Sequence, residues 1–338
     1  MIFMIFQDPA GFPCSGWPTG PWNGNSIKRM QLSETSYPVY SSLYPPVDPY
    51  ACALVDVGGG HRLYLEQCGN PKGMPMVYLH GGPGSACSPR HRQFFDPKIC
   101  RAVLFDQRGC GRSQPRGALT NNHTDALVQD LETLRQHLGI ERWLVVGGSW
   151  GAGLALAYAS SHQEVCLGLV LRGVFLGRDA DIDGFFHGGN SLQSLHVGLH
   201  GCDAAAALES ALAWEAWEQS VGQQRAVAPR GLPLAAAEAT QLVDKYRIQS
   251  HYLVNHCFRN DAGFLPSDGA LVGLPVAILH GRNDTICSPQ AALDLHQRLP
   301  GSLLHWAEGC GHDPFEQGNA AALVATIRYF ATHANFAL

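Results

Sequence analysis

One serine in this chain stands where a catalytic nucleophile would be expected. It is the centre of the pentapeptide Gly147-Gly148-Ser149-Trp150-Gly151. The apolar run at residues 143–146 before it favours a buried strand, and the alanine- and leucine-rich run at residues 152–159 favours a helix. Strand, G-x-S-x-G and helix in this order are typical of a nucleophile elbow, a tight turn that lifts the serine hydroxyl above the sheet. A glycine-rich loop without a catalytic role is the alternative, and both flanks disfavour it.

A serine hydroxyl is a poor nucleophile unless an oriented base removes its proton. In a fold built around such an elbow, the acid and the histidine follow the serine along the chain, each after a strand. Asp284 comes just after the strand-like run at residues 276–280, and His312 lies in a glycine-flanked loop before the last helical run. We therefore predict that Ser149 attacks, that His312 carries the proton, and that Asp284 holds the imidazole in the right tautomer.

Three neighbouring residues are weaker candidates for the acid and the base. Asp294 lies within a predicted helix, and Asp313 is too close to His312 in sequence to sit behind its ring. His305 belongs to a strand-like run and is better explained as a packing residue.

A tetrahedral intermediate on the serine needs hydrogen-bond donors aimed at its oxyanion. The backbone N–H of Trp150, the residue after the nucleophile, is the first expected donor. The second should come from the loop His80-Gly81-Gly82-Pro83-Gly84, which directly follows the strand-like run at residues 74–79. Within this loop we assign the N–H of Gly82.

The elements that must hold these residues alternate between strand and helix from about residue 51 onward, which predicts a mostly parallel sheet covered on both faces. The predicted strands are residues 74–79, 101–105, 143–146, 167–171 and 276–280, and the predicted helices are residues 124–138, 152–159 and 320–330.

Between residues 173 and 273 the pattern changes, because residues 204–219 and 235–254 are helical and no strand-like run interrupts them. We expect this segment to be an all-helical cap inserted into a core made of residues 38–172 and 274–338. Residues 1–37 mix glycine, proline and serine without a period, and we expect them to form a disordered N-terminal extension.

Composition excludes several classes of function. Lys and Arg number 23 against 28 Asp and Glu, a formal net charge of −5 without a basic block, so nucleic acid is not an expected partner. No apolar run reaches membrane-spanning length. The 11 cysteines are scattered and odd in number, which favours a reducing cytoplasm over a disulfide framework. His251 and His256 lack further ligands nearby in sequence, so neither a metal nor another cofactor is expected.

Several segments taken together resemble the proline iminopeptidases (prolyl aminopeptidases), capped α/β-hydrolases that remove an N-terminal proline from peptides. The G-x-S-x-G pentapeptide alone is common to many hydrolases, but its combination with two further segments is far more specific. These segments are His80-Gly81-Gly82-Pro83-Gly84 and Asp106-Gln107-Arg108-Gly109-Cys110-Gly111-Arg112-Ser113. The resemblance covers residue 43 to the C-terminus and implies the α/β-hydrolase fold with an inserted helical cap domain.

The resemblance also implies how a substrate amine would be recognised. An aminopeptidase binds a cationic N-terminus, and the family uses cap glutamates as counter-charges. Glu218, in Trp214-Glu215-Ala216-Trp217-Glu218, matches one of them, whereas the second position holds the uncharged Gln249. Replacing a charged acceptor by a neutral one should cost about 1 kcal/mol of binding free energy.

The expected pocket for the proline ring departs from the family pattern. Phe175 matches an aromatic residue that packs on the ring, but Gly184-Phe185 replaces a Trp-Tyr pair and Leu253 replaces a phenylalanine. The pocket should therefore be roomier and less aromatic. Two cysteines, Cys110 and Cys310, lie in the motifs around the site, and their role is open.

The resemblance implies a serine aminopeptidase that acts on peptides with a free N-terminus and prefers proline or a similar small residue. A second hypothesis is an esterase or amidase of the same fold without aminopeptidase specificity. A third is a non-catalytic ligand-binding protein, which a complete set of Ser149, Asp284 and His312 disfavours. The oligomeric state is not predicted.

Overall fold

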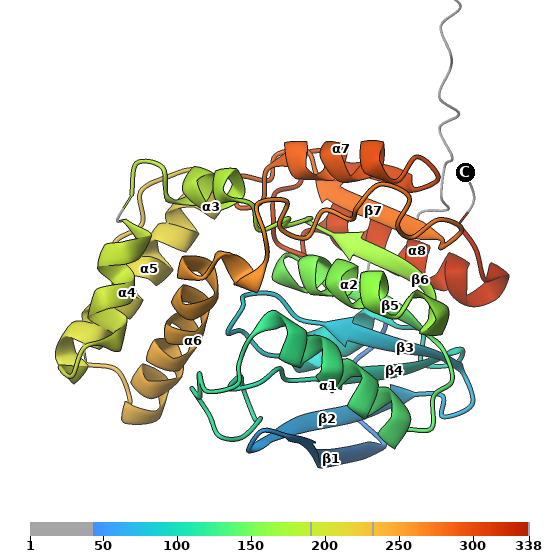
Figure 1. The fold of residues 1–338 in the computed structure, drawn as a ribbon, viewed down its shortest axis with the longest axis horizontal. Helices are drawn as coiled ribbons and strands as arrows, with labels where there is room; N and C mark the ends of the chain where they lie inside the picture. Colours follow the sequence, from blue (N-terminus) through green and yellow to red (C-terminus); the bar gives the residue numbers. More distant parts are fainter. Residues whose placement is uncertain (1–42, 190, 232, 337–338) are drawn as a thin grey trace, which may run out of the picture. The chain divides into compact units, whose positions relative to one another are not determined.

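The computed structural model describes residues 43–189, 191–231 and 233–336. Within these residues eight strands form one sheet in the order β1-β2-β4-β3-β5-β6-β7-β8 (Figure 1). The pairs β1–β2 and β2–β4 are antiparallel, and every pair from β4–β3 to β7–β8 is parallel. The strands are β1 (Ala51–Gly58), β2 (His61–Gly69), β3 (Met74–Leu79), β4 (Cys100–Phe105), β5 (Trp143–Gly148), β6 (Cys166–Arg172), β7 (Val276–Gly281) and β8 (Leu303–Ala307).

The central strands are mostly apolar because both faces of the sheet are covered. In β3, Val77 and Leu79 belong to one hydrophobic cluster, and Met76 and Tyr78 belong to a second cluster on the opposite face. The first cluster includes side chains of α1 (Thr124–His137), α2 (Trp150–Ser161) and α7 (Pro289–Arg298). The second includes α8 (Gln317–His333) and the short 3₁₀ helix η1 (Pro89–Phe94). This arrangement confirms the predicted α/β-hydrolase fold class.

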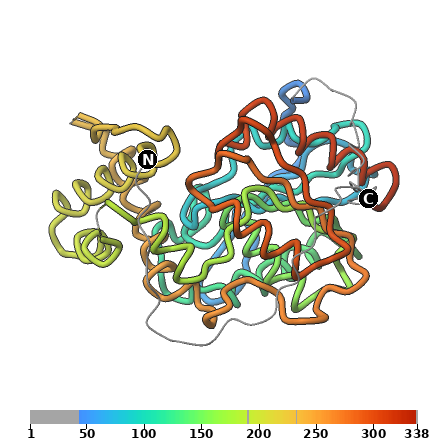
Figure 2. Tube along the Cα trace, turned by 90° about the horizontal axis from the view of Figure 1, so that it is seen from above, coloured from blue at the N-terminus to red at the C-terminus, as the bar shows by residue number. Residues whose placement is uncertain are grey.

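Four α-helices stand between β6 and β7 in the chain, and the described residues there include no strand. They are α3 (Asp179–Phe186), α4 (Leu192–His200), α5 (Ala204–Gln223) and α6 (Ala236–Val254). Figures 1 and 2 both show them grouped at one end of the sheet, beyond the start of α2. We refer to α3–α6 as the cap helices.

Hydrogen bonds and ring contacts fasten the cap helices to the core. The Thr124 hydroxyl donates to the Cys257 carbonyl at 2.5 Å, just beyond the end of α6. The Tyr252 hydroxyl donates to Asn122 Oδ1 at 2.7 Å, and the Tyr252 ring lies edge-on to Trp150 with 4.8 Å between the centroids. The residue after the nucleophile therefore packs directly against the cap.

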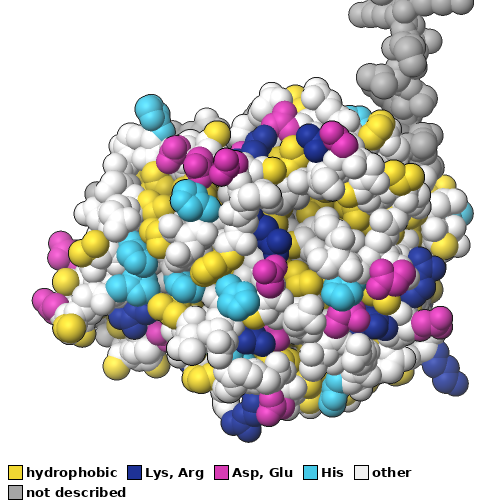
Figure 3. Space-filling model, in the orientation of Figure 1, with side chains coloured by type: hydrophobic (Ala, Val, Ile, Leu, Met, Phe, Trp, Pro, Cys, Tyr) yellow, Lys and Arg dark blue, Asp and Glu magenta, His cyan; other side chains and the backbone are white. Residues whose placement is uncertain are grey.

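The N-terminal extension expected at residues 1–37 lies outside the described residues. None of the helices in the described part of the chain is both long and apolar enough to cross a membrane. On the face of the molecule in Figure 3, basic and acidic side chains are interspersed.

Candidate active site

Ser149 occupies the turn between β5 and α2 in a strained backbone conformation. Its φ of 58° and ψ of −126° lie where residues with a Cβ are rarely found, at a cost of about 1–3 kcal/mol. Close packing explains the flanking glycines. A Cβ on Gly147 would clash with the Gly151 carbonyl, and a Cβ on Gly151 would clash with the Leu79 carbonyl. The G-x-S-x-G spacing is thus what allows β5, α2 and β3 to approach at this point.

His312 and Asp284 form a hydrogen-bonded pair. His312 Nδ1 donates to Asp284 Oδ2 at 2.7 Å, which leaves Nε2 as the acceptor nitrogen of the ring. The backbone N–H groups of Ile286 and Cys287 donate to Asp284 Oδ1 at 3.0 and 2.9 Å. Burial alone would raise the pKa of the Asp284 carboxyl, but His312, the nearby His280 and the hydrogen bond from the Cys287 N–H lower it below its usual value. Asp284 therefore stays ionised and can stabilise an imidazolium.

The Ser149 hydroxyl is not hydrogen-bonded to His312. Among the described residues its polar neighbour is Cys287, with 3.8 Å between Oγ and Sγ. Hydrogen bonds between nucleophile and base are often made only once a substrate is bound. Ser149 and His312 nevertheless line the same cavity.

The loop expected to carry the oxyanion donors lies against the nucleophile. A Cβ built on Gly81 would be 3.3 Å from the Ser149 Cβ, and Gly82 lines the cavity beside the serine. Trp150 is the first residue of α2, so its N–H belongs to the helix start, where backbone donors lack an acceptor within the helix. Gly82 therefore borders the same cavity as the nucleophile, and Trp150 follows the nucleophile directly in the chain; their roles as oxyanion donors stay a prediction.

One glutamine connects these two donor segments. Gln107 Nε2 donates to the His80 carbonyl at 2.9 Å, and Gln107 Oε1 accepts from Trp150 Nε1 at 2.9 Å. The Gln107 backbone N–H also donates to His80 Nε2 at 3.0 Å. Burial lowers the pKa of the His80 imidazole, in keeping with a neutral ring that accepts this hydrogen bond.

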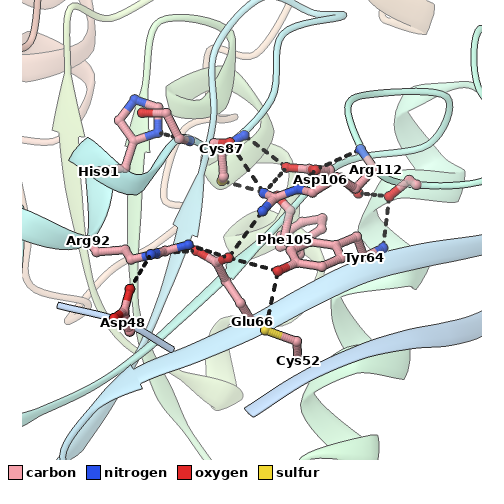
Figure 4. Close-up of polar contacts among 12 residues, drawn as sticks. Asp48, Cys52, Tyr64, Glu66, Cys87, His91, Arg92, Phe105, Asp106 and Arg112 are labelled. Carbon is pink, nitrogen blue, oxygen red and sulfur yellow. Dashed lines mark hydrogen bonds and ion pairs between the residues drawn. The ribbon is translucent and has the colours of Figure 1, made fainter. Parts of the chain in front are cut away.

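Two charged residues of the segment that begins at Asp106 belong to a network of ion pairs (Figure 4). Arg112 Nε donates to Asp106 Oδ2 at 2.7 Å, and its Nη1 reaches Glu66 Oε2 at 3.2 Å. Arg92 makes a second pair with Glu66 at 2.8 Å. Because these arginines satisfy two carboxylates that are fully buried, the network fixes the loop after β4 and with it the position of Gln107.

The cavity at Ser149 has a volume of about 590 Å³, large enough for a small ligand. All of the predicted substrate-binding residues line it, namely Phe175, Phe185, Glu218, Gln249 and Leu253. Asp284 and Trp150 are not part of the lining. Asp284 is expected only to orient His312, and Trp150 is expected to contribute only its backbone N–H. Predicted site residues from the core and from the cap helices therefore lie around one cavity.

Glu218 is placed differently from expectation in one respect, because its carboxylate is already paired. Lys245 Nζ lies 2.9 Å from Glu218 Oε2, and the Tyr246 hydroxyl donates to the same oxygen at 2.8 Å. Burial would raise the pKa of the Glu218 carboxyl, but the Lys245 ammonium and the hydrogen bonds from Lys245, Tyr246 and Gln249 lower it. Gln249 Oε1 is buried and has no hydrogen-bond partner within the described residues.

Aromatic residues of the cap helices complete the lining. Phe185 and Phe186 meet edge-on with 4.9 Å between their centroids, and Trp217 Nε1 donates to the Phe185 carbonyl at 2.9 Å. Nothing lies within 4 Å of where a Cβ of Gly184 would be. Gly184 itself is exposed and does not line the cavity, so the roomier pocket expected from the Gly184-Phe185 pair stays a prediction.

Among the residues of the site that the sequence did not point to, three bear on its chemistry. Lys245 and Cys287 line the cavity, and Gln107 joins the donor segments behind it. For Gln107 a signal existed, since it lies in the candidate segment that follows β4. Cys110 and Cys310, the cysteines singled out from the sequence, are buried and do not line the cavity. Burial raises the pKa of the Cys287 thiol well above its usual value.

Known proteins resemble this chain over most of its length. The sequence profile of the α/β hydrolase fold matches residues 74–186. A proline iminopeptidase of Xylella fastidiosa is 41% identical over 316 residues, which cover 86% of this chain and 99% of that protein. The proline iminopeptidase of Arabidopsis thaliana is 39% identical over 314 residues, with coverage of 84% and 80%.

Solved structures show the same fold at lower identity. The proline iminopeptidase of Mycobacterium smegmatis superposes with a TM-score of 0.55 at 18% identity, over 84% of this chain and 99% of that one. An esterase from Rhodococcus gives a TM-score of 0.55 at 21% identity, over 86% and 100%. At these identities the structural likeness extends to the fold alone.

Proposed function

The chain belongs to the proline iminopeptidase family of α/β hydrolases, and from this premise we propose that it is a serine aminopeptidase that releases an N-terminal proline, or a similar small residue, from peptides. The observation that carries the proposal is that three functional groups meet at one cavity. It holds Ser149 on a strained turn, the imidazole of His312 backed by Asp284, and the carboxylate of Glu218.

In the proposed acylation step, Ser149 Oγ attacks the carbonyl carbon of the first residue, and His312 Nε2 takes the hydroxyl proton. Asp284 stabilises the imidazolium, and the N–H groups of Gly82 and Trp150 stabilise the oxyanion. The imidazolium then protonates the leaving amine as the peptide bond breaks. The products of this step are the shortened peptide and a prolyl ester on Ser149.

In the deacylation step, water attacks the prolyl ester while His312 accepts its proton. Collapse of the second tetrahedral intermediate returns this proton to Ser149 Oγ and releases free proline. No further group is required for the cycle, because His312 acts first as base and then as acid in each half.

Recognition of the free N-terminus is proposed to depend on Glu218 and Gln249. A carboxylate is the natural counter-charge for a secondary ammonium. Gln249 Oε1 is buried and has no hydrogen-bond partner among the described residues. A hydrogen bond from the substrate amine would offset the free-energy cost of burying this oxygen, and this favours binding. Phe175, Phe185 and Leu253 supply apolar surface for the ring.

A substrate panel tests the proposal. Turnover of the p-nitroanilides of proline, hydroxyproline and alanine should be compared with that of a short p-nitrophenyl ester. Proline anilide should give the highest kcat/KM among the anilides. If the protein cleaved the ester but none of the anilides, the esterase or amidase hypothesis would be supported instead. The ion pair of Glu218 with Lys245 favours this second hypothesis, because it occupies the carboxylate that an aminopeptidase needs for the substrate amine.

We also propose the division into a core of residues 38–172 and 274–338 and a cap of residues 173–273. The grouping of α3–α6 between β6 and β7 supports it. A cytoplasmic location is proposed as well, on the ground that all ten cysteines in the described part of the chain are free thiols.

A further inference from the structure

Lys245 on α6 makes an ion pair with the residue that should bind the substrate amine. Its Nζ lies 2.9 Å from Glu218 Oε2 and 3.1 Å from the Tyr246 hydroxyl, and it lies 4.3 Å from the centre of the Tyr246 ring. Both side chains of the pair are largely sheltered, with exposures of 29% for Lys245 and 28% for Glu218. The Lys245 ammonium thus has the partners that the ammonium of a substrate would need.

The charges at this end of the cavity are therefore balanced before any substrate enters. Glu218 contributes one negative charge and Lys245 one positive charge, and the adjacent Gln249 is neutral. The other carboxylate of the cap helices in the lining, Asp181, is held by Arg178 through two hydrogen bonds of 2.9 Å. A cationic N-terminus consequently meets a site without net negative charge.

We propose that Lys245 is a specificity-determining residue that competes with the substrate ammonium for Glu218. The inference rests on the proposed aminopeptidase function and concerns the same site. Two cations that contact the same carboxylate in a sheltered cavity repel each other more strongly than they would in water. The substrate must therefore displace Lys245 or share the carboxylate with it at a cost, and either event weakens the binding of free N-termini.

Full displacement of Lys245 would move its ammonium toward other cations. Besides the active-site cavity, Lys245 lines a second cavity of about 540 Å³. The carboxylates in that lining, Asp106 and Glu238, are already paired with Arg112 and Arg230, and the lining includes one further arginine. Sharing of the Glu218 carboxylate between Lys245 and the substrate ammonium is therefore the form of competition that we expect.

The test is calorimetric binding of L-prolinamide, a ligand with a free secondary amine, to Ser149→Ala protein with and without Lys245→Met. Methionine keeps the length of the apolar stem but removes the charge. We expect Lys245→Met to lower the Kd for prolinamide about tenfold, which corresponds to 1.4 kcal/mol. Lys245→Arg retains the charge and should leave the Kd within about twofold. N-acetyl-prolinamide, which lacks the cation, should bind equally to all three proteins.

A decrease in Kd cannot come from a damaged fold, so this outcome separates competition from a merely structural role of Lys245. Unchanged or weaker binding of prolinamide by the Lys245→Met protein would overturn the inference, and so would absence of binding to every variant. Labelling of Lys245→Met protein with an intact Ser149 by a fluorophosphonate checks that the site is assembled. Failure of the unaltered protein to cleave proline anilide would count against the proposed function alone, because the calorimetric comparison does not require turnover.

Discussion

The Gln107 side chain accepts a hydrogen bond of 2.9 Å from the indole of Trp150, the residue directly after the nucleophile. The other end of the same amide donates to the His80 carbonyl at 2.9 Å. One side chain therefore sets the distance between the two backbone segments proposed to form the oxyanion hole. Gln107 touches no substrate in this arrangement and is a positioning residue.

Replacing Gln107 by leucine should impair catalysis more than binding. Loss of a direct oxyanion donor typically lowers kcat by about 10²–10³, and here the donors are displaced rather than removed. We expect Gln107→Leu to lower kcat for proline p-nitroanilide by about ten- to a hundredfold with little change in KM. The free energy of unfolding should fall by about 1–3 kcal/mol, because the His80 carbonyl and the Trp150 indole lose their partner.

A matched control for this variant is Gln67→Leu. Gln67 Oε1 accepts from Arg101 Nε and Nη2 at 3.0 and 2.7 Å, and Gln67 does not line the active-site cavity. Its replacement should reduce stability and leave kcat unchanged. Similar losses of kcat in both variants would show that Gln107 acts through general stability and not through the donor segments.

Two replacements of Ser149 should be equally inactive but differ in stability. Ser149→Ala and Ser149→Gly both remove the nucleophile, so kcat should fall at least about a thousandfold. Only glycine adopts a φ of 58° and a ψ of −126° without strain. Ser149→Gly should therefore be about 1 kcal/mol more stable than Ser149→Ala in urea unfolding. Near-normal turnover by either variant would contradict the assignment of the nucleophile.

Asp284→Asn tests the proposed role of the buried carboxylate in catalysis. Asparagine can present an N–H to His312 Nδ1, which stabilises the wrong tautomer of the imidazole, and the charge that stabilises the imidazolium is lost. We expect kcat to fall by about 10⁴ while fluorophosphonate labelling is slowed to a similar degree. Turnover within tenfold of the unaltered protein would remove Asp284 from the triad.

The same variant should change how stability depends on pH. The pKa of Asp284 is lower in the folded protein than its usual value, so the ionised form favours folding. This contribution is complete above the unfolded pKa of about 3.9 and disappears as the pH falls through the folded pKa. The urea midpoint of the unaltered protein should therefore fall more steeply below about pH 4 than that of Asp284→Asn. Parallel curves for the two proteins would contradict the lowered pKa.

Local sequence predicted the core of the site because its residues directly follow strands. Each of Ser149, Asp284 and His312 lies in a short loop at a strand end, and the parallel sheet brings such loops to one edge. Position along the chain alone was therefore sufficient to place them together. The antiparallel strands β1 and β2 were not predicted individually. β1 is largely exposed although residues 51–55 are apolar, and β2 mixes polar and charged residues with apolar ones, so neither has the pattern of a strand buried on both faces.

The pairing of Lys245 with Glu218 could not be predicted in this way. The two residues are 27 positions apart on different helices, and only the packing of α5 against α6 brings them within hydrogen-bonding distance. Lys245 belongs to none of the motifs in the sequence, so it was not a candidate for the site. Cys287 shows the same limit, because proximity to a motif in sequence favoured Cys110 and Cys310, whereas the fold placed Cys287 beside Ser149.

Glu218→Gln should weaken the recognition of free amines specifically. The variant keeps the shape of the side chain but loses the charge that attracts a secondary ammonium. We expect KM for proline p-nitroanilide to rise about tenfold, in line with the loss of a hydrogen bond between charged groups, with an unchanged KM for a short acyl ester. Glu215→Gln is the matched control, since Glu215 lies on the same helix and pairs with Arg230 outside the cavity. Equal effects on anilide and ester would exclude amine recognition by Glu218.

Gln249→Glu should have the opposite effect, because it adds a second carboxylate next to Glu218. With Lys245 still present, this end of the cavity would carry a net charge of −1 and would attract the substrate cation. We expect KM for proline p-nitroanilide to fall about tenfold, whereas Gln249→Met, which removes the buried acceptor, should raise it.

The pH dependence of KM provides an independent check on the Gln249→Glu variant. The new carboxyl would be buried beside Glu218, and both burial and the like charge raise its pKa. The advantage of the variant over the unaltered protein should therefore be largest at neutral pH and shrink as the pH falls and the new carboxyl is protonated. A ratio of KM values that stays constant from pH 5 to pH 8, or a KM that rises in the variant at neutral pH, would show that residue 249 does not contact the substrate amine.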